Sequence, residues 1–212
     1  MTDLLIDGPE AAATTVLLAH GAGAAMDSPA MTAAARALAG EGLRVARFEF
    51  GYMAARREGV RRPPSRAETV MPEYRAAVAA LAVPGRLVIG GKSMGGRVAS
   101  MVADGLHAEG WVAGLVCLGY PFHPPGRPER PRTGHLAALA TPALIVQGTR
   151  DPFGSRAEVD GYRLSPAIRV LWLEDGDHDL RPRKAVTGLT AAEHMAAMAR
   201  AVADWAGRLP GG

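Results

Sequence analysis

The sequence predicts an α/β fold built on a mostly parallel, doubly wound sheet. Short apolar runs of strand length alternate with helical patterns along the chain, which is the order of elements in βαβ units. Several of these runs are continuously apolar rather than alternating, as is typical of parallel strands that are covered on both faces. The chain has 212 residues, enough for one substantial core and short for two. We therefore expect a single domain over residues 1–212.

Six apolar runs are expected to be strands, because each is short and bounded by turn-forming residues. In a doubly wound sheet their carboxyl ends meet at one edge, where the loops form the site. The expected strands are Thr15–Ala19, Leu43–Phe48, Leu87–Gly90, Gly114–Gly119, Ala143–Gln147 and Arg169–Leu173.

Four helices are expected between and after these strands. Ser28-Pro29 provides an N-cap and an N1 proline, a helix start that fixes the backbone angle in advance. Thr190 and Glu193 are spaced as a capping box, in which each side chain satisfies a free N–H of the helix start. The expected helices are 28–40, Glu73–Leu81, Met94–Leu106 and 190–207; two segments rich in Arg and Pro, Ala54–Arg66 and Pro121–Arg132, are expected to be loops.

Composition excludes several classes of protein. The formal net charge of +3 is too small to indicate nucleic-acid binding, and no apolar run is long enough for a membrane helix. Cys117 is the only cysteine, so the chain can form no intrachain disulfide and offers no cysteine pair for a structural metal. We expect a cytoplasmic protein with no metal and no cofactor. The sequence gives no oligomeric state.

The strongest functional signal is Gly91-Lys92-Ser93-Met94-Gly95, which lies directly between an expected strand and an expected helix. A Gly-x-Ser-x-Gly segment in this context presents a serine nucleophile on a sharp, strained turn. Glycines are needed there because side chains two residues either side of the serine would clash in the turn. The N–H of Met94, at the positive end of the helix, is expected to stabilise an oxyanion.

Two nucleotide-binding interpretations of the glycines do not fit. A phosphate-binding loop ending in Gly91-Lys92-Ser93 would need glycine at position 86, where the chain has Arg86, and the preceding residues are strand rather than loop. A dinucleotide-binding turn beginning at Gly21 would need glycine at position 26, which is Met26.

The serine needs a base, and the base needs a carboxylate to orient it. Asp151 follows the strand Ala143–Gln147, and His178 follows the strand Arg169–Leu173, so both belong at the same edge as Ser93. The order Ser, Asp, His is the order found in hydrolases with this kind of turn. We therefore expect Ser93, Asp151 and His178 to form a catalytic triad.

Some alternatives stay open at this point. Asp175 or Asp177 could replace Asp151, although both adjoin His178 in the sequence. His107 and His194 fall in expected helices and suit structural roles, whereas His123 and His135 could line the site.

Substrate contacts are expected from the loops at the same edge. The second oxyanion N–H is assigned to Ala22, with Gly23 as the alternative, and His20 is expected to tie that loop through hydrogen bonds. Charges of one sign around a cleft attract ligands of the opposite sign, so arginines in the loops predict an anionic substrate. The candidate wall and charge residues are Tyr52, Phe122, Phe153, Arg61 and Arg62.

The chain resembles the α/β-hydrolase superfamily over essentially its whole length, in particular the dienelactone-hydrolase-like branch of short members. The segments LGYPFHPPG at 118–126 and QGTRDPFG at 147–154 are similar to a small group of bacterial hydrolases. That group in turn resembles the hydrolase-like domain of a regulatory subunit of a chromatin-acetylating complex. The resemblance implies the same triad and no cofactor. Dienelactone hydrolases proper have a cysteine where this chain has Ser93.

The sequence therefore predicts a serine hydrolase that cleaves a small-molecule ester or related acyl bond through an acyl-enzyme on Ser93. The connection 120–141, where larger relatives have a lid, is only about 20 residues long, so we expect an open site with little or no lid. The alternative class is a scaffold or binding protein that retains a hydrolase fold. Such a protein would be expected to have lost part of the triad, and here all three positions are filled.

Overall fold

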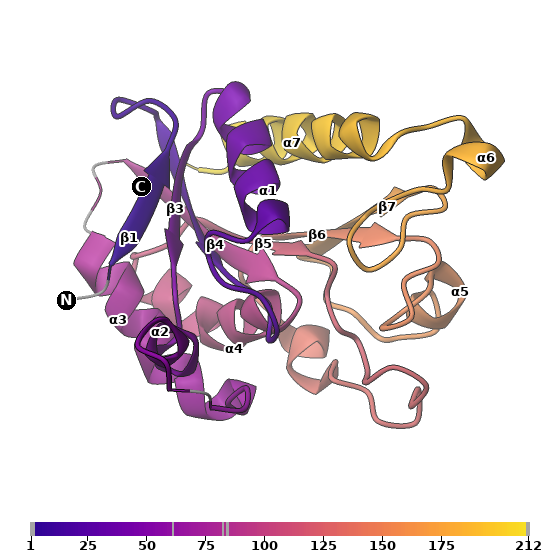
Figure 1. Cartoon of the computed structure of the whole chain (residues 1–212), viewed down its shortest axis with the longest axis horizontal. Coiled ribbons are helices and arrows are strands. Elements are labelled where there is room, and N and C mark those ends of the chain that lie inside the picture. The colour runs from indigo at the N-terminus through magenta and orange to yellow at the C-terminus, as the bar shows by residue number, and fades with distance from the viewer. Residues whose placement is uncertain (1–2, 61, 82, 84, 211–212) are drawn as a thin grey trace.

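A seven-stranded sheet forms the centre of the computed structural model, which describes residues 3–60, 62–81, 83 and 85–210. The strand order is β1-β3-β2-β4-β5-β6-β7 (Figure 1). Every neighbouring pair is parallel except β1 and β3, which run antiparallel. The strands are β1 (Leu4–Asp7), β2 (Thr14–Ala19), β3 (Arg44–Phe48), β4 (Arg86–Lys92), β5 (Gly114–Leu118), β6 (Ala143–Gly148) and β7 (Ile168–Leu173).

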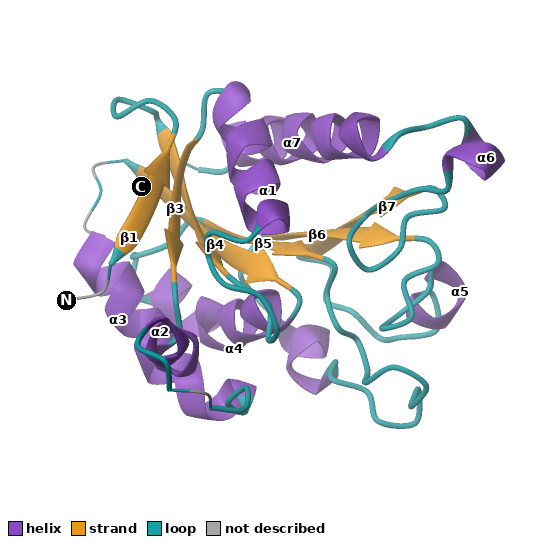
Figure 2. Cartoon of the chain, in the orientation of Figure 1, coloured by secondary structure: helices purple, strands orange, loops and turns teal. Residues whose placement is uncertain are grey.

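Helices cover both faces of this sheet, with α1 and α7 on one side and α3 and α4 on the other (Figure 2). The helices are α1 (Pro29–Gly40), α2 (Gly51–Arg57), α3 (Met71–Leu81), α4 (Met94–Ala108), α5 (Arg156–Val159), α6 (Lys184–Thr187) and α7 (Ala191–Gly207), with 3₁₀ turns η1 (Ala67–Val70) and η2 (Gly134–Ala138). In the described part of the chain, no helix is long and apolar enough to cross a membrane.

The two-sided burial of the sheet explains its continuously apolar strands. In β2, Leu17 belongs to the core cluster that includes residues of α3 and α4. Its neighbours Val16 and Leu18 belong to the cluster with α1 and α7. Side chains alternate between faces along a strand, so a strand buried on both faces needs apolar residues at every position.

Tyr74 of α3 fixes the central strand just before the candidate site. Its buried hydroxyl accepts a hydrogen bond from Gly90 N–H at 2.8 Å. Its single proton can be donated to Gly90 O at 2.7 Å or to Leu17 O at 3.2 Å. Gly90 has no room for a side chain, because an added Cβ would lie 2.0 Å from the carbonyl oxygen of Val116. Strand β4 therefore reaches the sheet edge in a fixed position.

The predicted fold class is confirmed, with corrections in detail. The six predicted strands do not include β1, a four-residue strand at the edge of the sheet, and the short helices α5 and α6 were not predicted. Residues from Ala54 were expected in a loop, whereas α2 continues to Arg57. The exposed arginines of this short helix gave it the composition of a loop.

Candidate active site

Ser93 lies on a strained turn between β4 and α4. Its backbone has φ 52° and ψ −117°, a combination that glycine adopts far more readily than other residues. A Cβ on Gly95 would lie 2.4 Å from the carbonyl oxygen of Ala19, and one on Gly91 would lie 2.5 Å from the same atom. The predicted crowding within the turn is confirmed for Gly91, whose added Cβ would lie 2.7 Å from the carbonyl carbon of Gly95. For Gly95 the collision is instead with the backbone of β2 and the residue after it.

The structure brings Ser93, His178 and Asp151 together in one hydrogen-bonded chain. His178 Nε2 lies 2.9 Å from Ser93 Oγ, and His178 Nδ1 lies 2.8 Å from Asp151 Oδ2. Asp151 is fully buried, so its carboxylate must accept its hydrogen bonds from protein groups rather than from water. Its remaining acceptor capacity is used by Phe153 N–H at 2.8 Å and the Gln147 side-chain amide at 2.9 Å. We infer that Nδ1 holds the imidazole proton, which leaves Nε2 free to accept from the serine hydroxyl.

The alternative carboxylates have other partners. Asp175 accepts from the backbone N–H of Arg183 at 2.6 Å and forms an ion pair with that side chain. These hydrogen bonds from Arg183 lower the pKa of Asp175 to about 2. Asp177 accepts from the backbone N–H groups of Asp179 and Arg181, both at 2.9 Å. Both aspartates hold the loop that carries His178 rather than its imidazole.

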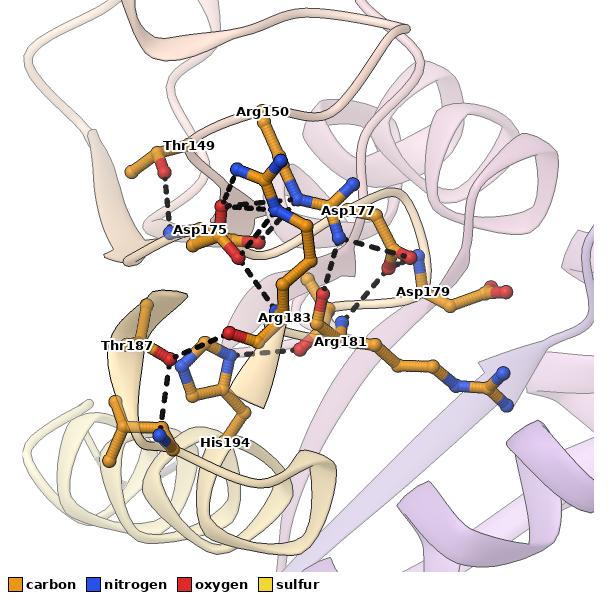
Figure 3. A network of polar contacts seen from close by, with 11 residues as sticks. Thr149, Arg150, Asp175, Asp177, Asp179, Arg181, Arg183, Thr187 and His194 are labelled. Atoms are coloured by element: carbon orange, nitrogen blue, oxygen red, sulfur yellow. Dashed lines mark hydrogen bonds and ion pairs between the residues drawn. The ribbon is translucent and has the colours of Figure 1, made fainter. Parts of the chain in front are cut away.

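That loop, residues 174–183, is fastened by contacts from several elements (Figure 3). It contains two residues with positive φ, Asp175 at 55° and Leu180 at 62°. Arg150 Nε donates to the carbonyl of Asp175 at 2.7 Å, and Thr149 Oγ1 accepts from Asp175 N–H at 2.8 Å. The ring of His194 on α7 lies 2.9 Å from the carbonyl of Leu180, so the structural role predicted for His194 is confirmed. These contacts fix the conformation of the loop and therefore the position of the His178 imidazole.

The loop that begins at His20 lies beside the nucleophile. An added Cβ on Gly21 would be 3.7 Å from Ser93 Cβ. The buried His20 ring accepts from Phe50 N–H through Nε2 at 3.1 Å and lies 2.7 Å from the carbonyl of Gly21 through Nδ1. Burial lowers the pKa of His20, which favours the neutral ring that this pattern needs. The prediction that His20 ties the loop by hydrogen bonds is confirmed.

The three residues predicted to line the walls of the site differ in burial and in their contacts. Phe153 is half-buried and stacks on the imidazole of His178, with ring centroids 4.1 Å apart. Phe122 is fully buried and packs on Tyr120 at 4.9 Å, so its assignment as a wall of the site is wrong. Tyr52 is also buried and donates from its hydroxyl to the carbonyl of Ala22 at 3.1 Å. It supports the loop instead of lining a cleft.

The loop arginines that were expected to attract an anionic substrate are only partly placed as expected. Arg61 lies outside the described residues, and Arg62 is exposed. Arg57, in the same segment, pairs with Glu49 at 2.7 Å and Asp27 at 2.9 Å. Its positive charge is therefore neutralised. No group of three or more His, Cys, Asp or Glu side chains in the described part of the chain is arranged to hold a metal ion.

Two residues that were not predicted, Gln147 and Lys92, contact the triad. Gln147, at the end of β6, donates to Asp151 and accepts from Tyr120 N–H at 2.7 Å. Lys92 donates from Nζ to the carbonyl of His178 at 2.6 Å. The signal for Gln147 was a polar side chain at the end of an otherwise apolar run, whereas no local pattern indicated the contact of Lys92.

A doubly wound sheet that presents a serine elbow, a histidine and a buried aspartate at one edge defines an α/β hydrolase. Comparison with known proteins gives the family: the chain belongs to the alpha/beta hydrolase domain family, whose model matches residues 12–207. The narrower resemblance to a chromatin-complex subunit stays a prediction.

Solved structures of known hydrolases share this fold. A lidless α/β serine hydrolase of Xanthomonas campestris superimposes with a TM-score of 0.70 at 21% identity, over 99% of this chain and 90% of that one. A dienelactone hydrolase of Anabaena variabilis gives 0.69 at 21% identity, over 96% and 90%. An esterase domain of Rhodothermus marinus gives 0.66 at 16% identity, over 99% of both chains. At these identities the likeness establishes the fold.

Proposed function

We propose that this protein is a serine hydrolase that cleaves a small-molecule ester or related acyl bond through an acyl-enzyme on Ser93. The observation that supports this most is the continuous chain of contacts from Ser93 Oγ through both nitrogens of His178 to Asp151. A serine hydroxyl is a weak nucleophile until a base within hydrogen-bond reach accepts its proton.

The proposed acylation step starts with attack of Ser93 Oγ on the ester carbonyl carbon. The hydroxyl proton moves to Nε2 of His178, and the carbonyl oxygen becomes an oxyanion. The N–H groups of Met94 and Ala22 are the proposed donors to this oxyanion. Met94 is the first residue of α4, and the first N–H groups of a helix have no partner within it. One such donor contributes about 10²–10³ in turnover.

The intermediate then collapses, and the C–O bond to the leaving alcohol breaks. Nε2 returns its proton to that alcohol, which departs. Water then attacks the acyl carbon while the same nitrogen takes a proton from it. The bond between that carbon and Ser93 Oγ breaks, Nε2 returns the proton to Oγ, and the acid departs. The proposed role of Asp151 is to stabilise the imidazolium that forms in each half-reaction.

The substrate is proposed to carry an anionic group, and Arg132 is the residue that supports this. Its guanidinium is partly buried, and no carboxylate of the described residues lies within 4.0 Å of it. Burial and the charge of Arg97 lower the pKa of Arg132. Arg97 is one helical turn after Ser93 and pairs with Glu68 at 2.6 Å. One carboxylate thus faces two guanidiniums beside α4, the helix that begins directly after Ser93, and a substrate carboxylate would balance the excess charge.

Fluorophosphonate labelling tests the proposed function. Wild-type protein should gain one phosphonyl mass on the peptide that contains Ser93, and Ser93→Ala should gain none. Hydrolysis of p-nitrophenyl acetate should fall about 10³-fold or more in that variant. Equal labelling of the two proteins, or no labelling of either, would instead support a binding protein with a hydrolase fold.

A further inference from the structure

The side chain of Lys92 connects two separate segments of the candidate site. It is the last residue of β4 and directly precedes Ser93, yet its ammonium reaches across to the loop after β7. Nζ donates to the carbonyl oxygen of His178 at 2.6 Å and lies 3.4 Å from Asp179 Oδ1. One side chain therefore links the turn that presents the nucleophile to the main chain of the base itself.

The side chains that reach this loop from Arg150 and from α7 contact it at a distance from His178. Arg150 contacts the carbonyls of Asp175 and Arg181, and His194 contacts the carbonyl of Leu180. Among the described residues, Lys92 alone places a side-chain donor on the carbonyl of His178. The contacts further along fix the shape of the loop, and the contact from Lys92 fixes the residue whose ring must meet Ser93 Oγ.

The surroundings strengthen this hydrogen bond. The Lys92 side chain is only 14% exposed, and a small cavity of about 30 Å³ beside it is lined by Met31, Met195 and Met198 among others. Burial lowers the pKa of Lys92, as expected for an ammonium against an apolar wall. Polar contacts are stronger in such low-dielectric surroundings than in water, and they cost more when they are lost.

Gly119 leaves the space that the contact requires. It follows β5 and has φ 63°. An added Cβ would lie 2.7 Å from the carbonyl oxygen of His178 and 3.2 Å from Lys92 Nζ. A side chain at this position would wedge the donor and acceptor apart. The close approach of Lys92 to His178 is thus built into three separate segments of the chain.

We propose that Lys92 is a positioning residue whose ammonium holds the main chain of His178 and thereby sets the imidazole over Ser93. The inference rests on the proposed function of Ser93 and His178. Lys92 does not touch the reacting atoms. Its effect should therefore appear in the rate of attack rather than in substrate binding, because a displacement of the base by about 1 Å can cost on the order of 10² in rate.

The test compares Lys92→Met with Lys184→Met. Methionine matches the lysine stem without its charge or its donors, and Lys184, the other lysine of the chain, is exposed on α6. In Lys92→Met, kcat for p-nitrophenyl acetate should fall about 10- to 100-fold with KM changed less than about threefold. The rate of phosphonylation at Ser93 should fall in parallel. Lys184→Met should behave as wild type in both assays.

A folded Lys92→Met protein with wild-type kcat would overturn the proposal, as would a change confined to KM. If circular dichroism shows that Lys92→Met does not fold, Lys92→Gln, which keeps a polar end, is measured in the same way and decides the question. Failure of the proposed function gives a different result. In that case the wild type itself neither hydrolyses the ester nor reacts with the phosphonate, and the proposed positioning role of Lys92 is refuted together with the proposed function.

Discussion

Replacing Ser93 by glycine should give a more stable protein than replacing it by alanine. Both changes remove Oγ and its contact with His178 at 2.9 Å, so the loss of that hydrogen bond cancels in the comparison. What differs is the Cβ atom, which alanine keeps in a backbone conformation of φ 52° and ψ −117°.

The size of the difference follows from two opposing terms. A Cβ in a positive-φ conformation costs about 1–2 kcal/mol, and glycine removes this strain. Glycine also makes the unfolded chain more flexible, which lowers stability by about 0.4–1 kcal/mol. The free energy of unfolding of Ser93→Gly should therefore exceed that of Ser93→Ala by about 1 kcal/mol, or about 2–4 °C in Tm for a chain of this length.

The measurement is urea or thermal unfolding of both variants, followed by circular dichroism under identical conditions. Neither variant should have activity, so catalysis does not enter the comparison. Ser100 gives a matched control, because it lies within α4, where glycine is about 1 kcal/mol less favourable than alanine. The order of stability should reverse there. A Ser93→Ala protein as stable as Ser93→Gly would refute the claim that the turn is strained.

Three further predictions concern the triad, the core and the charge near the site. Asp151→Asn should fold but lose turnover by about 10²–10⁴-fold, and near-normal kinetics of that variant would show that the acid is misassigned. Tyr74→Phe should destabilise the protein by about 1–3 kcal/mol, because the buried N–H of Gly90 loses its partner; an unchanged midpoint in urea would contradict this. Arg132→Gln should lower kcat/KM for a p-nitrophenyl ester with a carboxylate on its acyl chain but not for the neutral ester of equal length. The preference of the wild type for the carboxylate-bearing ester should weaken as salt is added. The control Arg127→Gln, at an exposed position, should leave this preference unchanged. Equal kcat/KM for both esters in the wild type would contradict an anionic substrate.

The parts of the site that sequence predicted are those fixed by local chemistry. The glycines around Ser93 are required by the turn itself. The placement of Asp151 and His178 follows from the strands before them, because parallel strands deliver their next residues to one edge. Residues with a local cause can therefore be assigned before a structure exists.

The rest depended on contacts between distant segments. Lys92 and His178 are 86 positions apart, and no local pattern indicates that they meet. Phe122 and Phe153 each follow a strand, and only tertiary packing decides that one ring is buried and the other stacks on His178. Strand β1 is short and only partly buried, so it lacks the continuous apolar run that revealed its neighbours.

The position of β7 at the end of the sheet has a consequence for how the protein loses activity. Among the described strands, β7 pairs with β6 alone, whereas β4, which leads to Ser93, is paired on both sides. Edge elements open by local fluctuations that cost less than global unfolding. Such an opening would carry His178 away while the nucleophile stays in place. Amide hydrogen exchange in β7 should thus be faster than in β4. Mild heating should reversibly abolish hydrolytic activity at a temperature below that at which the rest of the sheet unfolds.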